Sequence, residues 1–215
     1  MKRYAAFPLL PLLFCALSVI LGACSDDDEP WPSYAQGLLD LPTDPSGVAA
    51  KAVFDNGDEC ALDQPFTSLR PDSLYRVQAI YVYDGEKVHI ASCAPILSLP
   101  FKTYRPGSVK TDPLQVVAVW QTRRYVNLQL DLKGTVGGKH AFGHHKLELR
   151  ENPDGSRTQE SLLIHDAGAD PAYYTRTVYL SLPLQPLPEG LTAGRDTLRL
   201  TVNTHEGNRH YAFPL

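Results

Sequence analysis

Apolar and polar residues alternate along most of the chain beyond residue 46, and no window has the three-to-four-residue spacing of an amphipathic helix. Segment 125–132, YVNLQLDL, has an apolar side chain at every second position, and segments 178–182 and 197–202 repeat the pattern. Successive side chains of a strand point to opposite faces, so one face of each segment should be buried and the other polar. The chain is therefore predicted to be all-β. The expected buried faces carry Val126, Leu128, Leu130, Leu132, Val178, Leu180, Leu182, Leu198, Leu200 and Val202.

Turn signals separate the expected strands. Asp55-Asn56-Gly57 and Asp84-Gly85 each lie between apolar runs. Asn and Gly accept the positive φ that a tight hairpin turn requires, so each site predicts a β-hairpin. Residues 152–155, NPDG, predict a third turn between two strands.

The order of these elements predicts two β domains after a tether. Residues 24–45 are first acidic and then rich in proline, which favours an extended linker. Residues 46–104 hold short, strongly turned strands that suit either a small OB-like barrel or a meander. A stretch with Pro and Gly near residues 103–113 marks a junction. Residues 105–215 hold six or seven strands with polar outer faces, as in an antiparallel β-sandwich.

The first 23 residues have the composition of an export signal. Lys2 and Arg3 precede an apolar run that ends in small residues. An uncleaved membrane anchor is the alternative, but Pro8 and Pro11 interrupt the run and the residues after it are acidic. Residues 21–24, LGAC, resemble the lipobox of bacterial lipoproteins. The resemblance implies cleavage before Cys24 and attachment of acyl chains such as palmitate to this residue, which would hold the protein on a membrane surface.

A short acidic run follows the expected lipidated cysteine directly. A segment with this charge cannot bury surface, so we expect a solvated tether. The run resembles the export signal of surface lipoproteins in Bacteroidetes, which implies a position on the outer face of the outer membrane. The alternatives are a protein that faces the periplasm and a run that only spaces the domains from the lipid. The run consists of Ser25, Asp26, Asp27, Asp28 and Glu29.

The charge balance argues against nucleic acid as a partner. The formal net charge is -4, and loss of Lys2 and Arg3 with the signal would change it to -6. The four acidic residues of the run 26–29 supply -4 of that charge, so the folded part is close to neutral. Binding to phosphates requires a basic face, which this composition does not offer.

Two cysteines remain after Cys15 leaves with the signal and Cys24 takes the lipid. Cys60 and Cys93 would lie in an oxidising compartment, where two thiols in one small domain favour a disulfide. A redox pair is less consistent with the sequence because the C-x-x-C spacing is absent. A cysteine metal site would need more ligands than these two thiols.

The order of features resembles the NigD-like proteins of Bacteroidetes over nearly the whole mature chain. The likeness rests on the lipoprotein signal, VFDNGDEC, RVQAIYVYDGEKVHI, RYVNLQLDLKG, KHAFGHHKLELRENPDG, ESLLIHDAGADP and TVYLSLPL. Membership would imply an N-terminal OB-like domain and a C-terminal β-sandwich. It implies no catalytic residues, and a connection with bacteriocin immunity is the one functional suggestion that it carries.

Two histidine clusters are the candidates for chemistry. His140, His144 and His145 could share a metal ion if their loop folds back, although adjacent side chains of a strand point apart. A solvated turn that carries histidines is the preferred interpretation. His165 is followed by Asp166 and Asp170, an arrangement in which an acid could orient an imidazole, but it also fits a buried strand that ends in a turn.

No motif for catalysis stands out, so a binding role is the leading hypothesis. Trp120, Tyr173, Tyr174 and Tyr179 could form a platform for sugar stacking, although Trp120 and Tyr125 also suit a core. The sequence predicts a lipid-anchored envelope protein that binds a protein or a glycan. No cofactor is expected. The alternatives are a bacteriocin-immunity protein and a metal-dependent or hydrolytic surface enzyme built around the histidines.

Overall fold

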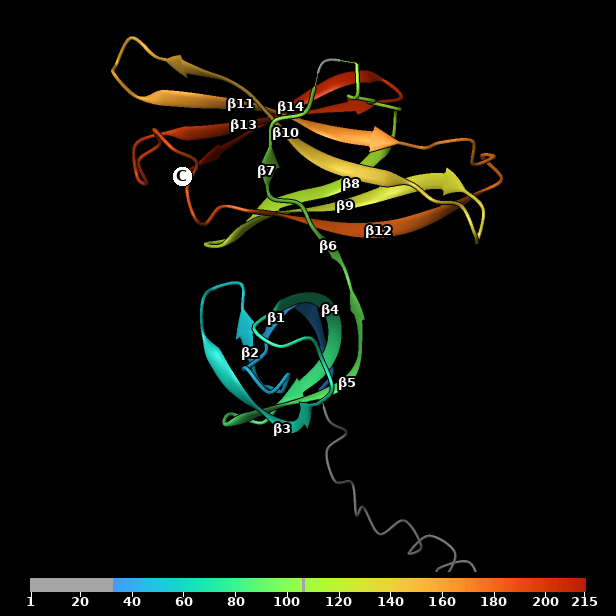
Figure 1. Ribbon diagram of the computed structural model, residues 1–215, viewed down its shortest axis with the longest axis vertical. Helices are drawn as coiled ribbons and strands as arrows, with labels where there is room; N and C mark the ends of the chain where they lie inside the picture. The colour runs from blue at the N-terminus through green and yellow to red at the C-terminus, as the bar shows by residue number, and fades with distance from the viewer. Residues whose placement is uncertain (1–32, 106) are drawn as a thin grey trace, which may run out of the picture. The chain divides into compact units, whose positions relative to one another are not determined.

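A computed structural model describes residues 33–105 and 107–215, which form strands, turns and loops (Figure 1). The export signal, Cys24 and the acidic run 25–29 lie outside the described residues, so the expectations for them stay predictions. Within the described ranges, no helix has the length and apolar character needed to cross a membrane. Residues 34–215 form one compact unit.

The N-terminal strands close into a small barrel in the order β1-β2-β3-β5-β4. All neighbouring pairs are antiparallel except β3 and β5, which are parallel. The predicted OB-like barrel is thus confirmed, and the meander is excluded. The strands are β1 (Ala35–Pro42), β2 (Ala49–Phe54), β3 (Glu59–Phe66), β4 (Leu74–Tyr83) and β5 (Lys87–Pro95).

The first strand corrects the predicted extent of the tether. The prolines around residues 35–42 predict a linker, but these residues form β1 and pair with β4 over their whole length. The side chains of Leu39 and Leu41 are buried in the barrel core. Burial of these leucines outweighs the local signal of the flanking prolines, so the barrel begins at Ala35 and not at residue 46.

The expected hairpin turns form as predicted. Residues 55–58 connect β2 to β3, and Asp84–Glu86 connect β4 to β5. Gly57 and Gly85 have φ angles of 96° and 101°, which a residue with a side chain rarely adopts. The third predicted turn, at residues 152–155, connects two antiparallel strands of the C-terminal domain.

Two facing sheets make up the C-terminal domain, and the antiparallel pairs within them are joined by parallel pairs such as β11 with β13. One sheet has the order β14-β13-β11-β10-β7 and the other β6-β12-β9-β8 (Figure 1). The predicted β-sandwich is confirmed. Its strands are β6 (Leu97–Ser98), β7 (Phe101–Lys102), β8 (Gln115–Gln121), β9 (Tyr125–Gly134), β10 (Ala141–Glu151), β11 (Arg157–Asp166), β12 (Tyr174–Pro183), β13 (Thr197–Thr204) and β14 (Gly207–Pro214).

The connection between the domains belongs to the sandwich. β6 pairs with β12, and β7 pairs with β10, so one short segment adds a strand to each sheet. The sandwich therefore begins at Leu97, ahead of the predicted boundary at residue 105. Two-residue strands leave no alternation to detect, which is why the sequence pattern missed them.

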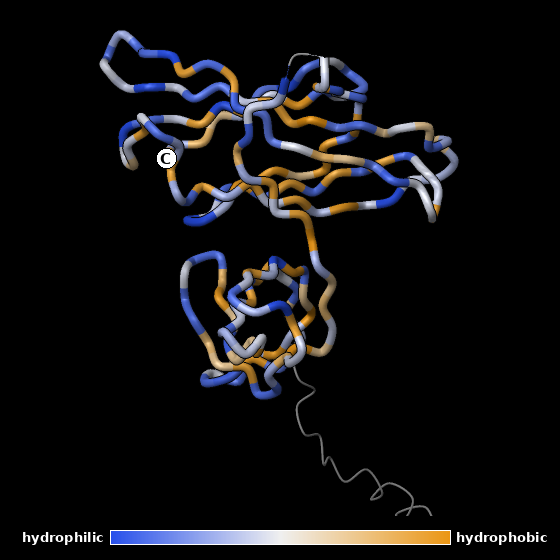
Figure 2. The backbone as a smooth tube through the Cα atoms, viewed as in Figure 1, coloured by the Kyte–Doolittle hydropathy of each residue, from blue (hydrophilic) through white to orange (hydrophobic). Residues whose placement is uncertain are grey.

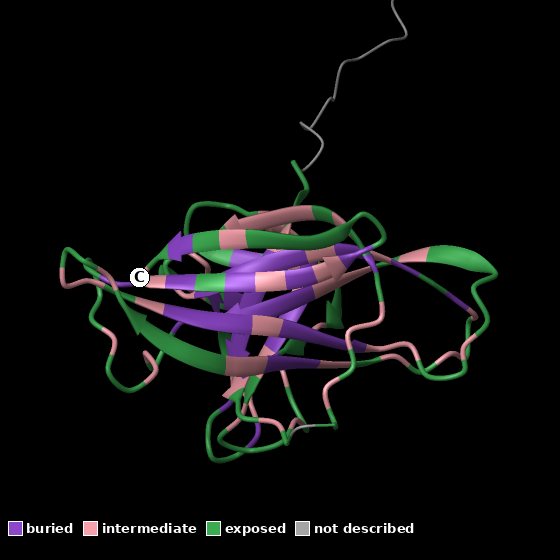
Figure 3. Ribbon diagram, turned by 90° about the horizontal axis from the view of Figure 1, so that it is seen from above, coloured by how far each residue is buried: buried purple, intermediate pink, exposed green. Residues whose placement is uncertain are grey.

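The alternating leucines and valines fill the sandwich core as expected, and Figure 2 shows apolar residues distributed along the strands of the sandwich. Val126, Leu128, Leu130 and Leu132 are at most 1% exposed, and Figure 3 shows the buried residues concentrated along the strands. The opposite faces depart from the prediction. Asn127 on β9 and Ser181 on β12 are also fully buried, because residues of the barrel cover this part of the sheet.

The expected disulfide is absent, and both thiols are free. Cys60 precedes Ala61, which pairs with Lys87 in the parallel β3–β5 ladder. Cys93 lies six residues beyond Lys87 on β5, or roughly 20 Å along an extended strand. A disulfide requires Cα atoms within about 7 Å of each other. The two cysteines share a barrel but lie far apart along it.

Candidate functional site

A buried polar cluster joins the barrel to the sandwich, and we call it the joint. Its centre is Arg76 on β4, which is 3% exposed. The guanidinium reaches across the boundary, where Nε donates to Ser181 Oγ at 3.0 Å and Nη2 donates to Asn127 Oδ1 at 3.1 Å. Within the barrel, Nη1 lies 3.2 Å from Asp40 Oδ1 and 2.6 Å from Asp55 Oδ1. One cation therefore binds groups from four strands or turns.

The second half of the joint surrounds the carboxylate of Asp40, which has no exposed surface. Tyr125 donates its hydroxyl to Asp40 Oδ2 at 2.9 Å, and Arg124 Nη1 lies 2.8 Å from the same oxygen. The guanidinium of Arg76 also packs 4.1 Å from the centre of the Tyr125 ring. Burial, followed by the nearby Asp40 carboxylate, raises the pKa of Tyr125 to about 12. The phenol therefore stays a donor at any physiological pH.

Charge is balanced within the joint, since two arginines face two aspartates. Buried charges are tolerated when they are paired and hydrogen-bonded, whereas removal of one partner costs several kcal/mol. The joint thus holds the barrel against β9 and β12, and it fixes the shape of the surface where the two domains meet.

A groove lies beside the joint, with a volume of about 540 Å³. We call it the aromatic groove, because four aromatic side chains from both domains line it. The barrel supplies Phe54 and Tyr81, whose rings meet edge to face at 5.6 Å. The sandwich supplies Trp120 from β8 and Tyr179 from β12. Such rings offer flat apolar faces at little cost in conformational entropy.

Neutral polar groups complete the lining of the aromatic groove. Gln36 and Gln78 come from the barrel, and Gln129 and Thr122 come from the sandwich. An amide side chain both donates and accepts hydrogen bonds, and a hydroxyl does the same. The charged residue of the lining, Asp55, is already paired with Arg76. This combination of rings and amides suits an uncharged ligand with many hydroxyl groups.

The sequence prediction found half of the aromatic set. Trp120 and Tyr179 were candidates for a stacking platform, and the groove brings them together, while Tyr125 is in the joint. Tyr173 and Tyr174 lie on the outer surface and do not line the groove. Phe54 and Tyr81 were missed because they belong to the other domain. The available signal was the position of Phe54 directly before a predicted hairpin turn.

The histidines of β10 do not converge. His144 is buried, with its ring 4.0 Å from that of Phe101, and burial lowers its pKa to about 4. His145 points to the other face, where it contacts Tyr104. The interpretation of residues 140–145 as a solvated turn is therefore wrong. Within residues 33–105 and 107–215, no three His, Cys, Asp or Glu side chains are placed to share a metal ion.

A different set of side chains forms a buried chain of hydrogen bonds, which we call the histidine relay. His140 Nε2 lies 3.1 Å from Asp170 Oδ2, and His140 Nδ1 lies 2.8 Å from His165 Nε2. His165 Nδ1 in turn lies 2.8 Å from the carbonyl oxygen of Asp112. Asp166, the neighbour of His165 in the sequence, takes no part and pairs with Lys110 instead.

Two glycines make room for the acid of the histidine relay. A Cβ atom at Gly138 would lie 1.6 Å from Asp170 Oδ2, and one at Gly134 would lie 2.3 Å from it. The carboxylate also accepts a hydrogen bond from the Thr135 hydroxyl at 2.7 Å, which lowers the pKa of Asp170. The tight turn after β9 is therefore shaped around this carboxylate. The spacing of these residues in the sequence follows no strand or helix period, so the sequence pattern did not predict that they lie together.

The family follows from the sandwich. The model of the NigD-like C-terminal β-sandwich domain matches residues 99–215, more than half of the chain. The chain belongs to the NigD-like family. The resemblance predicted from the order of motifs is thus confirmed. The match begins between β6 and β7, ahead of the boundary expected at residue 105.

Solved structures share both domains of this NigD-like chain. A NigD-like immunity protein from Bacteroides caccae is 25% identical with a TM-score of 0.62, and the alignment covers 85% of this chain and 93% of that one. A protein of unknown function from Bacteroides vulgatus is 16% identical with a TM-score of 0.66, covering 85% and 91%. A candidate lipoprotein from Bacteroides fragilis is 10% identical with a TM-score of 0.60, covering 84% and 96%. The last two likenesses concern the fold alone, and no curated protein matches the chain.

Proposed function

We propose that this NigD-like protein is a non-enzymatic binding protein of the cell envelope that holds a neutral saccharide in the aromatic groove. The observation that carries the proposal is the lining of the groove, which combines four aromatic rings with amide and hydroxyl groups. Sugar rings stack on aromatic faces through their C–H groups, and their hydroxyls pair with amides.

The joint supports this role by holding the two halves of the groove in place. Phe54 and Tyr81 come from the barrel, while Trp120 and Tyr179 come from the sandwich, so the site exists only when the domains are docked. A site that is assembled before the ligand arrives loses less entropy on binding. The buried network around Arg76 supplies that preorganisation.

The binding test uses the purified protein and soluble neutral oligosaccharides of glucose, xylose and mannose. We expect one of these classes to bind in calorimetry, and Trp120→Ala to weaken binding at least about fivefold, since loss of one stacked ring costs about 1–3 kcal/mol. The matched control is Tyr173→Ala, which removes an aromatic side chain that is 78% exposed and lies outside the groove. Gln36→Ala tests the hydrogen bonds at an exposed position.

Equal affinity in the two aromatic variants would contradict the proposal. So would the failure of every neutral class to bind while charged glycans or proteins do. Thermal unfolding of Trp120→Ala checks that the variant keeps its fold. If folded Trp120→Ala does not bind while Gln36→Ala binds with unchanged affinity, the ligand still lies in the groove but does not depend on Gln36.

Attachment to the membrane belongs to the same proposal. The LGAC sequence supports lipidation of Cys24, and the run 25–29 supports exposure on the outer surface. A Cys24→Ala variant should leave the detergent phase, since the acyl chains supply the membrane affinity. Proteolysis of intact cells distinguishes the two faces of the membrane, because only a surface-exposed protein should be degraded.

Bacteriocin immunity is the second candidate function. It is favoured by the 25% identity, across both domains, to a NigD-like immunity protein from Bacteroides caccae. Deletion of the gene should then make the cell sensitive to a toxin from a related strain. A deletion strain with unchanged sensitivity to all toxins tested, together with saccharide binding by the protein, would favour the first proposal.

A further inference from the structure

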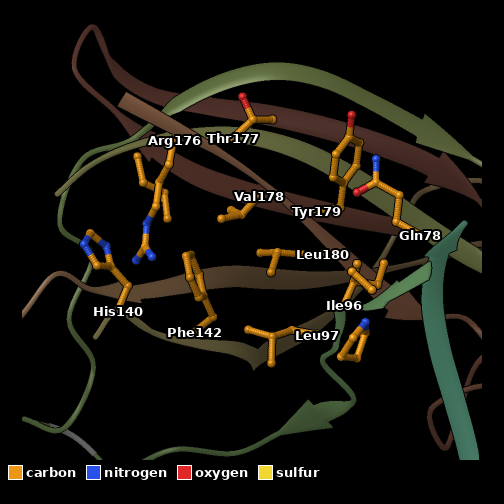
Figure 4. A pocket seen from close by; sticks show the side chains of 13 residues that line it. Gln78, Ile96, Leu97, His140, Phe142, Arg176, Thr177, Val178, Tyr179 and Leu180 are labelled. Atoms are coloured by element: carbon orange, nitrogen blue, oxygen red, sulfur yellow. The ribbon is translucent and has the colours of Figure 1, made fainter. Parts of the chain in front are cut away.

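A second cavity lies at the open edge of the sandwich, with a volume of about 310 Å³ (Figure 4). β6 covers β12 only at Leu180 and Ser181, so the rest of β12 has no neighbour on this side. The cavity opens along this uncovered part of β12 and extends between the two sheets. Its walls include Leu97, Phe142, Val178 and Leu180, which are apolar.

Arg176 points into this cavity without an acidic partner. Figure 4 shows its guanidinium directed toward His140 and Phe142. Nη2 donates to the carbonyl oxygen of Gly138 at 3.1 Å. Nε is buried and has no hydrogen-bond partner, and no ion pair involves Arg176 in the part of the chain that the structure describes. Arg176 is half-buried, and a cation that loses water without gaining a counter-ion is costly, which distinguishes it from the fully paired Arg76 in the joint.

The histidine relay beside the cavity does not supply the missing charge. Asp170, the acid of the relay, accepts a hydrogen bond from the Thr135 hydroxyl and lies 3.1 Å from His140 Nε2. Its contacts are thus made within the relay, and it forms no ion pair with Arg176.

We propose that this cavity binds a small organic carboxylate with a short apolar body. A carboxylate can accept two parallel hydrogen bonds from a guanidinium, and it would give Arg176 Nε the partner that it lacks. Phe142, Val178 and Leu180 then contact an aryl or short alkyl group. The volume is at the lower end of the range for small-molecule sites, about 300–1,000 Å³.

This site is separate from the aromatic groove, and the inference does not depend on the saccharide proposal. The two cavities share Gln78 and Tyr179 in their walls, but Arg176 and Phe142 line only the second one. Variants at Arg176 and at Trp120 should therefore act on different ligands.

The test is a titration of the whole folded protein with phenylacetate, hexanoate and glucuronate, with phenylacetamide as the neutral counterpart of phenylacetate. We expect the two apolar acids to bind and phenylacetamide to bind at least tenfold more weakly. Arg176→Gln should weaken phenylacetate binding at least tenfold, because a hydrogen bond to a charged group is lost. Trp120→Ala should leave it unchanged.

A second variant guards against misfolding of Arg176→Gln. Leu97 is 49% exposed, so Leu97→Trp should fold while its larger side chain narrows the cavity and reduces phenylacetate binding. Equal binding of acid and amide, binding of glucuronate alone, or unchanged binding in folded Arg176→Gln would overturn the inference. So would the absence of binding by both apolar acids at millimolar concentration.

Discussion

Two arginines of this protein lie at boundaries between β-sheets, but Arg76 is buried while Arg176 is half-buried, and their partners differ. Arg76 in the joint contacts two carboxylates, an amide and a hydroxyl, so all three of its nitrogens have partners. Arg176 at the edge of the sandwich has one carbonyl as its partner. The first arrangement is complete within the protein, while the second is completed by something from outside. Unpaired polar groups thus point to a ligand more directly than the presence of charge does.

Replacement of the fully paired arginine, Arg76, should have the largest effect on stability. Arg76→Met leaves Asp40 buried with one remaining cation, and we expect the free energy of unfolding to fall by about 3–5 kcal/mol. Urea unfolding measures this loss. Arg150→Met is the control, because Arg150 is an exposed partner of Glu148 and its loss should leave the free energy of unfolding close to that of the wild type. A loss below about 1 kcal/mol for Arg76→Met would mean that the joint is not needed for stability.

Acidification tests His144, a buried residue that belongs neither to the joint nor to the histidine relay. The pKa of His144 is about 4 in the folded protein, against about 6.5 in an unfolded chain. Because the pKa of His144 is lower in the folded protein, the neutral ring favours the folded state fully above pH 6.5. As the pH falls toward 4, the free energy of unfolding should decrease by up to about 3 kcal/mol. Unfolding at several pH values should show His144→Leu to be less sensitive than the wild type. His205→Gln, at an exposed position, should behave like the wild type.

Two adjacent glycines offer a matched pair for the histidine relay. Gly138→Ala places a methyl group against Asp170, and overpacking of this kind costs about 1–3 kcal/mol. Gly137→Ala meets nothing within 4 Å, so its stability should stay close to that of the wild type. Thermal unfolding compares the two, and equal melting temperatures would show that Asp170 moves aside without cost.

Arg176→Met is the counterpart of the first substitution, and its expected effect is much smaller. The change removes a cation that has no acidic partner, so stability should change by less than about 1 kcal/mol in either direction. Urea unfolding under the conditions used for Arg76→Met gives the comparison directly. A loss as large as that of Arg76→Met would show that Arg176 is a structural group.

The thiols provide the smallest expected effect. A disulfide in the barrel would stabilise the folded protein by constraining the unfolded chain. With both thiols free, a reducing agent should not change the melting temperature. Alkylation without reduction, read by mass spectrometry, should modify Cys93, which is exposed, faster than Cys60. A single species that resists alkylation until it is reduced would restore the disulfide hypothesis.

The sequence predicted the sandwich well because its signal is local. Leu128, Leu130 and Leu132 occupy alternate positions of one strand, and two-residue periodicity is sufficient to place them inside. The turns at Gly57 and Gly85 were equally accessible, since a positive φ leaves a residue signature. In contrast, β1 was hidden because its leucines lie between prolines, and only its pairing with β4 makes it a strand.

The candidate sites were largely beyond prediction because they are built from distant segments. Arg76 and Asn127 are 51 positions apart, and Asp170 meets His140 across 30 positions. The position of Asn127 on the polar face of β9 predicts contact with solvent. The alternation of apolar and polar residues is the same whether water or another domain covers that face. Neither pairing has a spacing that a linear pattern could reveal.

The segment Leu97–Lys102 has a practical consequence for work on isolated domains. It donates one short strand to each sheet, and Phe101 covers the ring of His144. A fragment cut at residue 105, where composition suggests the boundary, would lose both strands and uncover the middle of two sheet edges, at Leu180 and Ser181 of β12 and at His144 and His145 of β10. Bare edges template the addition of further chains. Such a fragment should therefore self-associate, and one that starts at Ile96 should stay dispersed.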